Sequence, residues 1–220
     1  LQAKGPTDRK DNMKAIRIHG PQEARYEEVP DPEAGPDDVL IRVKAVAICA
    51  TDVELYDGDM FYLTSGMASY PFIPGHEWSG EVVEVGSNVT GFSPGDAVVG
   101  ECSVGCRKCA RCLSGHYHLC DDRSETGILR RDGGMAEYIA FPQFFLHKVG
   151  ELPFDDAAFI EPTGVAINPA RKTNISPEDR VAVMGPGPIG LFAVQVAKAY
   201  GAKQVILVGG REERLQAGLD

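Results

Sequence analysis

Four cysteines of this chain lie close together at regular, short spacings. Cys106, Cys109, Cys112 and Cys120 follow the pattern C-x2-C-x2-C-x7-C. Thiolates spaced in this way can converge on one ion, and a tetrahedral zinc site needs four donors. A site with four protein ligands has no open position for a substrate, so we predict a structural zinc lobe over residues 101–120 that takes no part in the chemistry. Inert buried cysteines, or two disulfides, are the alternatives.

Two histidines and a fifth cysteine lie in the same stretch of sequence. His116 and His118 are of a metal-binding type, but because four cysteines are available we expect both histidines at the surface. Cys102 does not fit the spacing, and we interpret it as an ordinary buried or free thiol.

A second set of candidate ligands is scattered along the chain. Cys49, His76 and Glu161 each stand alone in the sequence. A catalytic zinc uses three protein ligands and an open position, and sulfur, nitrogen and oxygen donors suit it. A lone cysteine at the end of a strand-like run is more often part of the core, and a lone histidine is more often a polar residue with satisfied hydrogen bonds. From the residues alone, catalytic zinc is the weaker of the two interpretations.

Three glycines form a turn in the stretch "VMGPGPIG". Gly185, Gly187 and Gly190 match G-x-G-x-x-G between an apolar run and a helix-like segment that begins with Pro188 and Ile189. This context is typical of dinucleotide binding, in which the pyrophosphate lies against the N-terminus of the helix. A glycine-rich turn without a ligand is the alternative.

The elements that must position these residues change in kind along the chain. From residue 13 to about 150, short β-type runs alternate with Gly, Pro, Asn and Asp, which is typical of a barrel-like, all-β domain. A helix is expected over 156–172, with Pro162 in its first turn and Pro169 bending or ending it. One βαβ unit follows, with buried strands at 181–185 and 204–210 and a helix at 188–201 between them.

The predicted fold class is therefore a β-rich domain followed by an α/β domain. A doubly wound nucleotide-binding domain has about five or six parallel strands, and this sequence supplies two. We therefore expect either a fragment or a chain of which only the ordered part is given. Residues 1–12 are interpreted as a tag or a disordered arm.

The composition argues against several classes of partner. The 220 residues are 43% hydrophobic and 25% charged, which is ordinary for a globular protein, and the net charge is −10. An acidic surface repels phosphate backbones and anionic lipids, so we expect neither nucleic acid nor membrane as a partner. No apolar run approaches the roughly 20 residues of a membrane helix, and the polar N-terminus does not resemble a signal peptide. Clustered cysteines then favour metal binding in the cytoplasm over disulfides in a secreted chain.

Three motifs together resemble one family. The stretch "GHEWSGEVVEVG", the four-cysteine loop and the glycine turn follow one another, and from Met13 to Asp220 the sequence resembles the zinc-containing medium-chain alcohol dehydrogenases. The resemblance implies a GroES-like catalytic domain over 13–155 and an incomplete Rossmann dinucleotide-binding domain over 156–220. The runs "LCDDRSETGILRRDGGMAEY" and "EPTGVAINPA" are most similar to the branch of sorbitol, threonine and 2-deoxy-scyllo-inosamine dehydrogenases.

The resemblance also implies roles for the scattered ligands. Cys49 and His76 match the cysteine and histidine that bind the catalytic zinc, and Glu161 matches a third ligand of the sorbitol and threonine branch. Glu77 matches an alternative or exchanging ligand in that branch. Class I alcohol dehydrogenases have a cysteine where this chain has Glu161, so the chain resembles them less.

Three further residues match the catalytic machinery of the family. Thr51 matches the hydroxyl that hydrogen-bonds the substrate oxygen and starts a proton relay, and Asp52 matches a carboxylate that orients the ligand histidine. Many relatives have a relay histidine at the position of Glu54. The proton relay therefore runs through Glu54, through water, or not at all.

The choice of nicotinamide cofactor depends on the residues after the last predicted strand. NAD enzymes place an acidic residue there, about 20 residues after the glycine turn, against the ribose hydroxyls. Counted back from Arg214 and Leu215, which match an Arg-Leu pair of the family, that position is Gly209. Arg211 could bind a 2′-phosphate or could simply be solvated. The cofactor is therefore NADP or NAD, and the sequence favours NADP.

The sequence thus predicts a zinc-dependent oxidoreductase with two zinc ions per chain. It would transfer hydride between a secondary alcohol (a polyol, an amino-alcohol or a cyclitol) and a nicotinamide cofactor. The resemblance implies a cytoplasmic homodimer or homotetramer that acts on a small-molecule alcohol or ketone. The alternatives are a zinc-free quinone or enone reductase of the same superfamily, and a catalytically silent protein that binds zinc or cofactor.

Overall fold

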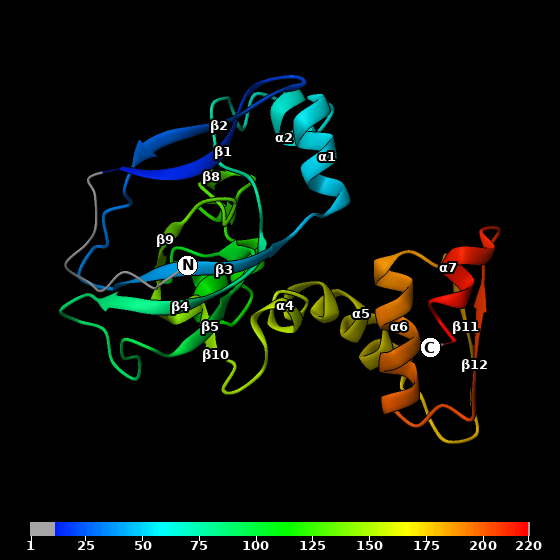
Figure 1. Cartoon of the computed structure of the whole chain (residues 1–220). Helices are drawn as coiled ribbons and strands as arrows, with labels where there is room; N and C mark the ends of the chain where they lie inside the picture. The colour runs from blue at the N-terminus through cyan, green and yellow to red at the C-terminus, as the bar shows by residue number, and fades with distance from the viewer. Residues whose placement is uncertain (1–11, 220) are drawn as a thin grey trace. The chain divides into compact units, whose positions relative to one another are not determined.

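The computed structural model describes residues 12–219, which form two compact units divided between Phe159 and Ile160 (Figure 1). The predicted domain boundary lies after residue 155. Residues 1–11 of the predicted arm and Asp220 lie outside the described residues. Asn12, which we also assigned to the arm, is instead the first residue of a strand, because it pairs with Pro30.

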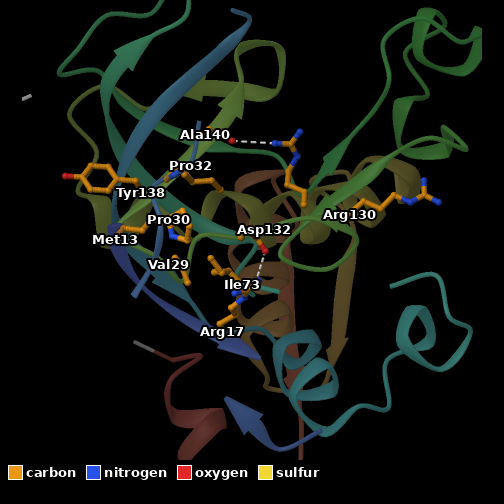
Figure 2. Close-up of a pocket in the computed structure, with 13 residues that line it drawn as sticks. Met13, Arg17, Val29, Pro30, Pro32, Ile73, Arg130, Asp132, Tyr138 and Ala140 are labelled. Carbon is orange, nitrogen blue, oxygen red and sulfur yellow. Dashed lines mark hydrogen bonds between the residues drawn. The ribbon is translucent and has the colours of Figure 1, made fainter. Parts of the chain in front are cut away.

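The first unit begins with a hairpin of β1 (Asn12–Gly20) and β2 (Glu23–Pro30). One face of the hairpin packs on a small apolar cluster that includes Met13, Ala15, Val29 and Ile73. A cavity of about 450 Å³ lies between this hairpin and β9 (Tyr138–Pro142), as Figure 2 shows. No predicted site residue lines this cavity.

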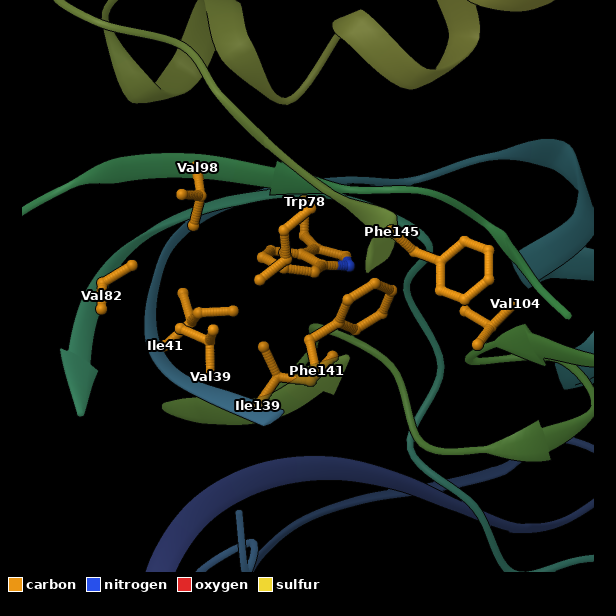
Figure 3. Packing of buried hydrophobic residues seen from close by; sticks show 10 residues of the cluster. Val39, Ile41, Trp78, Val82, Val98, Val104, Ile139, Phe141 and Phe145 are labelled. Atoms are coloured by element: carbon orange, nitrogen blue, oxygen red, sulfur yellow. The ribbon is translucent and has the colours of Figure 1, made fainter. Parts of the chain in front are cut away.

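The centre of the first unit is an antiparallel sheet with the strand order β10-β5-β4-β3-β9. The strands not yet given are β3 (Asp38–Ala47), β4 (Glu77–Val85), β5 (Ala97–Gly100) and β10 (Leu146–Lys148). Alternating apolar residues of these strands form the main core, in which the Trp78 and Phe141 rings meet edge to face at 5.2 Å (Figure 3). This β-rich unit agrees with the predicted fold class.

Short elements complete the first unit. A small three-stranded sheet consists of β6 (Ser103–Val104), β7 (Ser124–Thr126) and β8 (Arg130–Arg131). In the sequence, β6 precedes the cysteine loop, and β7 and β8 follow it. The helices of this unit are short: α1 (Ala50–Asp57), α2 (Phe61–Thr64), α3 (Ala110–Leu113), η2 (Tyr117–Leu119), η3 (Gln143–Phe145) and α4 (Phe154–Ala157).

The second unit contains the predicted βαβ arrangement. The parallel strands β11 (Arg180–Met184) and β12 (Gln204–Val208) are joined by α6 (Pro188–Ala199). The unit opens with α5 (Ile160–Thr173), which packs on α6, and ends with α7 (Glu212–Gln216). Its core is small and consists mainly of Ala166, Ala170 and Val196.

Two details of the second unit differ from the prediction. The strands β11 and β12 are not buried, because α6 covers only one face of this sheet, and Met184 on the other face is 84% exposed. The helix predicted over 156–172 is divided into α4 and α5. Pro162 lies in the first turn of α5 as predicted, whereas Pro169 lies inside α5, which continues for one more turn to Thr173. Within the described residues, no helix is long and apolar enough to cross a bilayer.

Candidate metal and cofactor sites

Pairing of β3 with β4 brings two distant parts of the sequence together. Ala47, the last residue of β3, pairs with Glu77, the first residue of β4. Cys49 follows shortly after β3 as the N-cap of α1, and His76 directly precedes Glu77. A cysteine, a histidine and a glutamate therefore meet at one end of the central sheet.

The donor atoms of Cys49, His76 and Glu77 all lie within 4.8 Å of one another. His76 and Glu77 are buried, with only 5% and 7% of their surface exposed, and Cys49 is half-buried. A buried carboxylate is costly unless it is paired or binds a metal. One thiol, one imidazole and one carboxylate are the mixed donor set of a catalytic zinc site with an open fourth position.

Asp52 lies behind this cluster and ties its two segments together. One carboxylate oxygen of Asp52 accepts a hydrogen bond from the Cys49 backbone N–H at 2.9 Å, and the other accepts one from the Gly75 N–H at 3.2 Å. The second oxygen also lies 3.8 Å from Nδ1 of His76, which is buried and makes no hydrogen bond within the described residues. Asp52 thus lies beside His76, and the roles that the resemblance implies for these two residues stay predictions.

Gly75 is a contributor that sequence reasoning missed. Its φ of 97° is in the left-handed region, where glycine is favoured, and this conformation presents its N–H to Asp52. The signal in the sequence was the glycine directly before His76. Without that turn, the N–H would not reach the carboxylate.

Burial shifts the protonation of two of the three donors. It raises the pKa of the Cys49 thiol, although hydrogen bonds from the backbone and side chain of Thr51 oppose the shift. Burial also raises the pKa of the Glu77 carboxyl, against the favourable charge of His76 and a hydrogen bond with Cys49. Burial thus shifts the equilibria of both groups toward their neutral forms, and a divalent cation would shift them toward the anionic forms.

Two predicted residues lie outside this group of three donors. Glu161 is in the first turn of α5, in the second unit. Its role as a zinc ligand stays a prediction, and Glu77 is the carboxylate that the structure brings to Cys49 and His76. Glu54 lies in α1 with an exposed side chain.

The four cysteines of the predicted lobe form a second group of donors. All four sulfurs lie within 4.8 Å of one another, with 3.9 Å between Cys106 and Cys112 and 3.7 Å between Cys109 and Cys120. A tetrahedron with zinc–sulfur distances of about 2.3 Å has edges of about 3.8 Å, which both sulfur pairs match. Backbone N–H groups of Lys108 and Cys109 lower the pKa of Cys106 to about 6, whereas burial raises the pKa of Cys112 to about 12.

Tyr117 anchors the cysteine lobe to the rest of the first unit. Its hydroxyl donates to the carboxylate of Glu101, and its ring packs edge to face on Phe145 at 5.3 Å. His116 and His118 are exposed, as predicted, and neither belongs to the group of four cysteines. Cys102 is half-buried, belongs to no disulfide, and packs in a different apolar cluster.

The glycine turn has the geometry that its motif predicts. Gly185 has a φ of 101°, and Gly187 caps α6 with Pro188 as the first helical residue. A Cβ at Gly190 would overlap the carbonyl oxygen of Gly185, so only glycine lets the helix begin so close to the strand. A Cβ at Gly187 would meet no atom within 4 Å, which leaves this side of the turn open to a ligand.

Comparison with known proteins identifies the family. The family model described as "Alcohol dehydrogenase GroES-like domain" matches residues 35–151, more than half of the chain. The chain belongs to this alcohol dehydrogenase family. The match covers Cys49, His76, Glu77 and all four cysteines of the lobe.

Individual relatives in the family are similar over most of this chain. It is 39% identical over 207 residues to sorbitol dehydrogenase of Bacillus subtilis (strain 168) and 40% identical over 205 residues to L-threonine 3-dehydrogenase of Shewanella frigidimarina (strain NCIMB 400). These alignments cover 94% and 92% of this chain, but only 58% and 59% of the relatives. The chain thus spans less than two thirds of the length of these relatives.

A solved structure of a dehydrogenase has a similar fold. A protein from Sinorhizobium meliloti 1021, described as a zinc-binding dehydrogenase bound to NADP, superposes with a TM-score of 0.87 at 34% identity. The superposition covers 96% of this chain and 60% of that protein.

Proposed function

We propose that this member of the alcohol dehydrogenase family catalyses zinc-dependent hydride transfer between a secondary alcohol and NAD or NADP. The observation that carries the proposal is the meeting of Cys49, His76 and Glu77, with Asp52 behind them. The relatives named for sorbitol and L-threonine support a polyol, amino-alcohol or cyclitol as the substrate.

Cys49, His76 and Glu77 would hold the catalytic zinc. Because Nδ1 of His76 faces Asp52, we infer that Nε2 is the metal-binding nitrogen. Asp52 would be the positioning residue, since its carboxylate lies 3.8 Å from Nδ1 and its negative charge would favour an Nδ1–H directed toward it. A zinc ion bound there supplies Lewis acidity toward the oxygen of an alcohol or ketone.

The residues around the cluster would complete the catalytic site. The hydroxyl of Thr51, which contacts the sulfur of Cys49, would hydrogen-bond a substrate oxygen and accept its proton. Glu54, exposed in the same helix, would pass that proton to water. Glu161, which the resemblance implies as the third ligand, would exchange with Glu77 at the zinc ion.

The glycine turn would hold the cofactor. The open side at Gly187 and the free N–H groups at the start of α6 suit a pyrophosphate, with Pro188 and Ile189 forming the first helical residues. Gly209 directly after β12, Arg211 at the N-cap of α7 and Arg214 within α7 would face the adenosine ribose.

We further propose two zinc ions per chain, the second one structural and held by the four cysteines. The partners would be a small-molecule alcohol or ketone and further copies of the chain, in a homodimer or homotetramer. The acidic net charge of −10 argues against nucleic acid and membrane partners and suits a cytoplasmic protein.

Zinc content and turnover test the proposal together. We expect two zinc ions per purified chain by plasma mass spectrometry, and one in each of Cys49→Ser and Cys109→Ser. Formation of NADH or NADPH with a panel of secondary alcohols should be lost in Cys49→Ser and retained in Cys109→Ser at temperatures where that variant is folded. A chain that contains no zinc and reduces quinones would contradict the proposal and favour the zinc-free reductases.

A further inference from the structure

The carboxyl ends of β11 and β12 lie side by side in the second unit. Met184 at the end of β11 pairs with Val208 at the end of β12, and the Gly185 N–H donates to the Val208 carbonyl at 2.9 Å. The glycine turn and the residues after β12 therefore share one edge of the sheet. In dinucleotide-binding folds, the first residue after the second strand meets the adenosine ribose, and an acidic residue there binds the hydroxyls of NAD.

Gly209 occupies this position, and the structure gives a steric reason for glycine. A Cβ at Gly209 would lie 2.5 Å from Cγ of Pro186 and closer still to its Cδ, nearer than side chains pack. The ring of Pro186, inside the glycine turn, fills the space that an acidic side chain would need for its first carbon. An acidic residue here would require the proline ring or the backbone to shift.

Arg211 places a positive charge at the same edge of the sheet, where NAD enzymes have a negative one. It is the exposed N-cap residue of α7 and forms no salt bridge or side-chain hydrogen bond within the described part of the chain. Between it and Gly209, a Cβ at Gly210 would meet no atom within 4 Å. Glu212 and Glu213 are the nearest carboxylates in sequence, and both are exposed in the first turn of α7.

We infer that Pro186, Gly209 and Arg211 together make this chain select NADP over NAD. The inference rests on the proposed function, since it concerns the cofactor of that site. Arg211 binds the 2′-phosphate, for which a planar guanidinium is well suited. Pro186 and Gly209 exclude the carboxylate that would bind the ribose hydroxyls of NAD and repel the phosphate.

Binding measurements test the selectivity without depending on turnover. Titration of the purified chain with NADPH and with NADH, followed by nicotinamide fluorescence, should give at least about tenfold tighter binding of NADPH. Arg211→Gln should weaken NADPH binding about tenfold or more and NADH binding much less, because the charge-assisted hydrogen bond to the 2′-phosphate exists only with NADPH. The matched control is Arg180→Gln, at the opposite end of β11, which should change neither affinity.

A second pair of variants tests the role of Pro186. Gly209→Asp alone should weaken binding of both cofactors, because its Cβ collides with the proline ring. Gly209→Asp combined with Pro186→Ala, which removes Cγ and Cδ, should bind NADH more tightly than NADPH. A switch to NADH in Gly209→Asp alone would overturn the steric part of the inference.

The outcomes separate the inference from the proposed function. Equal or tighter binding of NADH by the unaltered chain would overturn the selectivity and leave the proposed dehydrogenase intact. Binding of neither cofactor, with an intact fold by circular dichroism, would overturn the cofactor site itself and the inference with it.

Discussion

At the scale of single residues, Asp52 contacts three other residues of the candidate zinc site. It accepts from the N–H groups of Cys49 and Gly75 and faces Nδ1 of His76. We expect Asp52→Asn to lower zinc affinity at this site about 10- to 100-fold, because the positioning charge is lost and one backbone N–H now faces an NH₂ group. Competition with a chromophoric chelator measures the affinity.

The chain offers two controls for this variant. Asp57→Asn changes an exposed carboxylate at the end of the same helix and should leave zinc affinity unchanged. The four-cysteine site should also keep its affinity in both variants. Equal zinc affinity in Asp52→Asn and Asp57→Asn would show that Asp52 only supports the fold.

Individual residues differ in how far the sequence predicts them. The four cysteines are close in sequence, so their spacing alone predicts the group that the structure forms. Cys49 and His76 meet only because β3 pairs with β4 in one register, and no local pattern encodes that pairing. The resemblance implied both, with Glu161 as the third ligand and Glu77 as its alternative, whereas the carboxylate found beside Cys49 and His76 is that of Glu77.

At the scale of elements, the glycine turn between β11 and α6 depends on close backbone contact. A methyl group at Gly190 would overlap the carbonyl oxygen of Gly185, whereas one at Gly164, inside α5, would meet no atom within 4 Å. We therefore expect Gly190→Ala to destabilise the second unit by about 1–3 kcal/mol. Gly164→Ala should stabilise it by about 0.5–1 kcal/mol, because alanine favours the helix.

Urea denaturation followed by circular dichroism measures both changes. The two variants make the same chemical change in the same unit, so a difference in sign isolates the packing of the turn. Destabilisation of equal size in both would mean that the contact between Gly190 and Gly185 is not what constrains the turn.

The periodicity of apolar residues predicted the type of each element better than it predicted how deeply the element is buried. The alternation of apolar residues and turn residues identified the strands of the first unit, and the glycine turn located α6 between two strands. The apolar runs of β11 and β12 also predicted buried strands, which was wrong. Composition shows that a strand can be buried, but only tertiary packing decides which of its faces is covered, and here α6 covers one.

At the scale of the whole molecule, the two units bury apolar surface to different degrees. The first unit has a core around Trp78 and Phe141, both at most 1% exposed. In the second unit, Met184, Ile206 and Val208 on the sheet are 84%, 45% and 44% exposed. Because burial of apolar surface is the main stabilising term, the second unit should open more readily than the first.

Hydrogen exchange can measure this difference within one molecule. We expect amides of β11 and β12 to exchange at least about tenfold faster than those of β3 and β4, since a two-stranded sheet is marginally stable by itself. The hairpin of β1 and β2 is the matched comparison: it also has two strands, but Met13, Ala15 and Val29 are buried, so it should exchange more slowly than β11 and β12. Equal protection of both two-stranded sheets would show that exposure of the β11 and β12 side chains does not determine how easily the second unit opens.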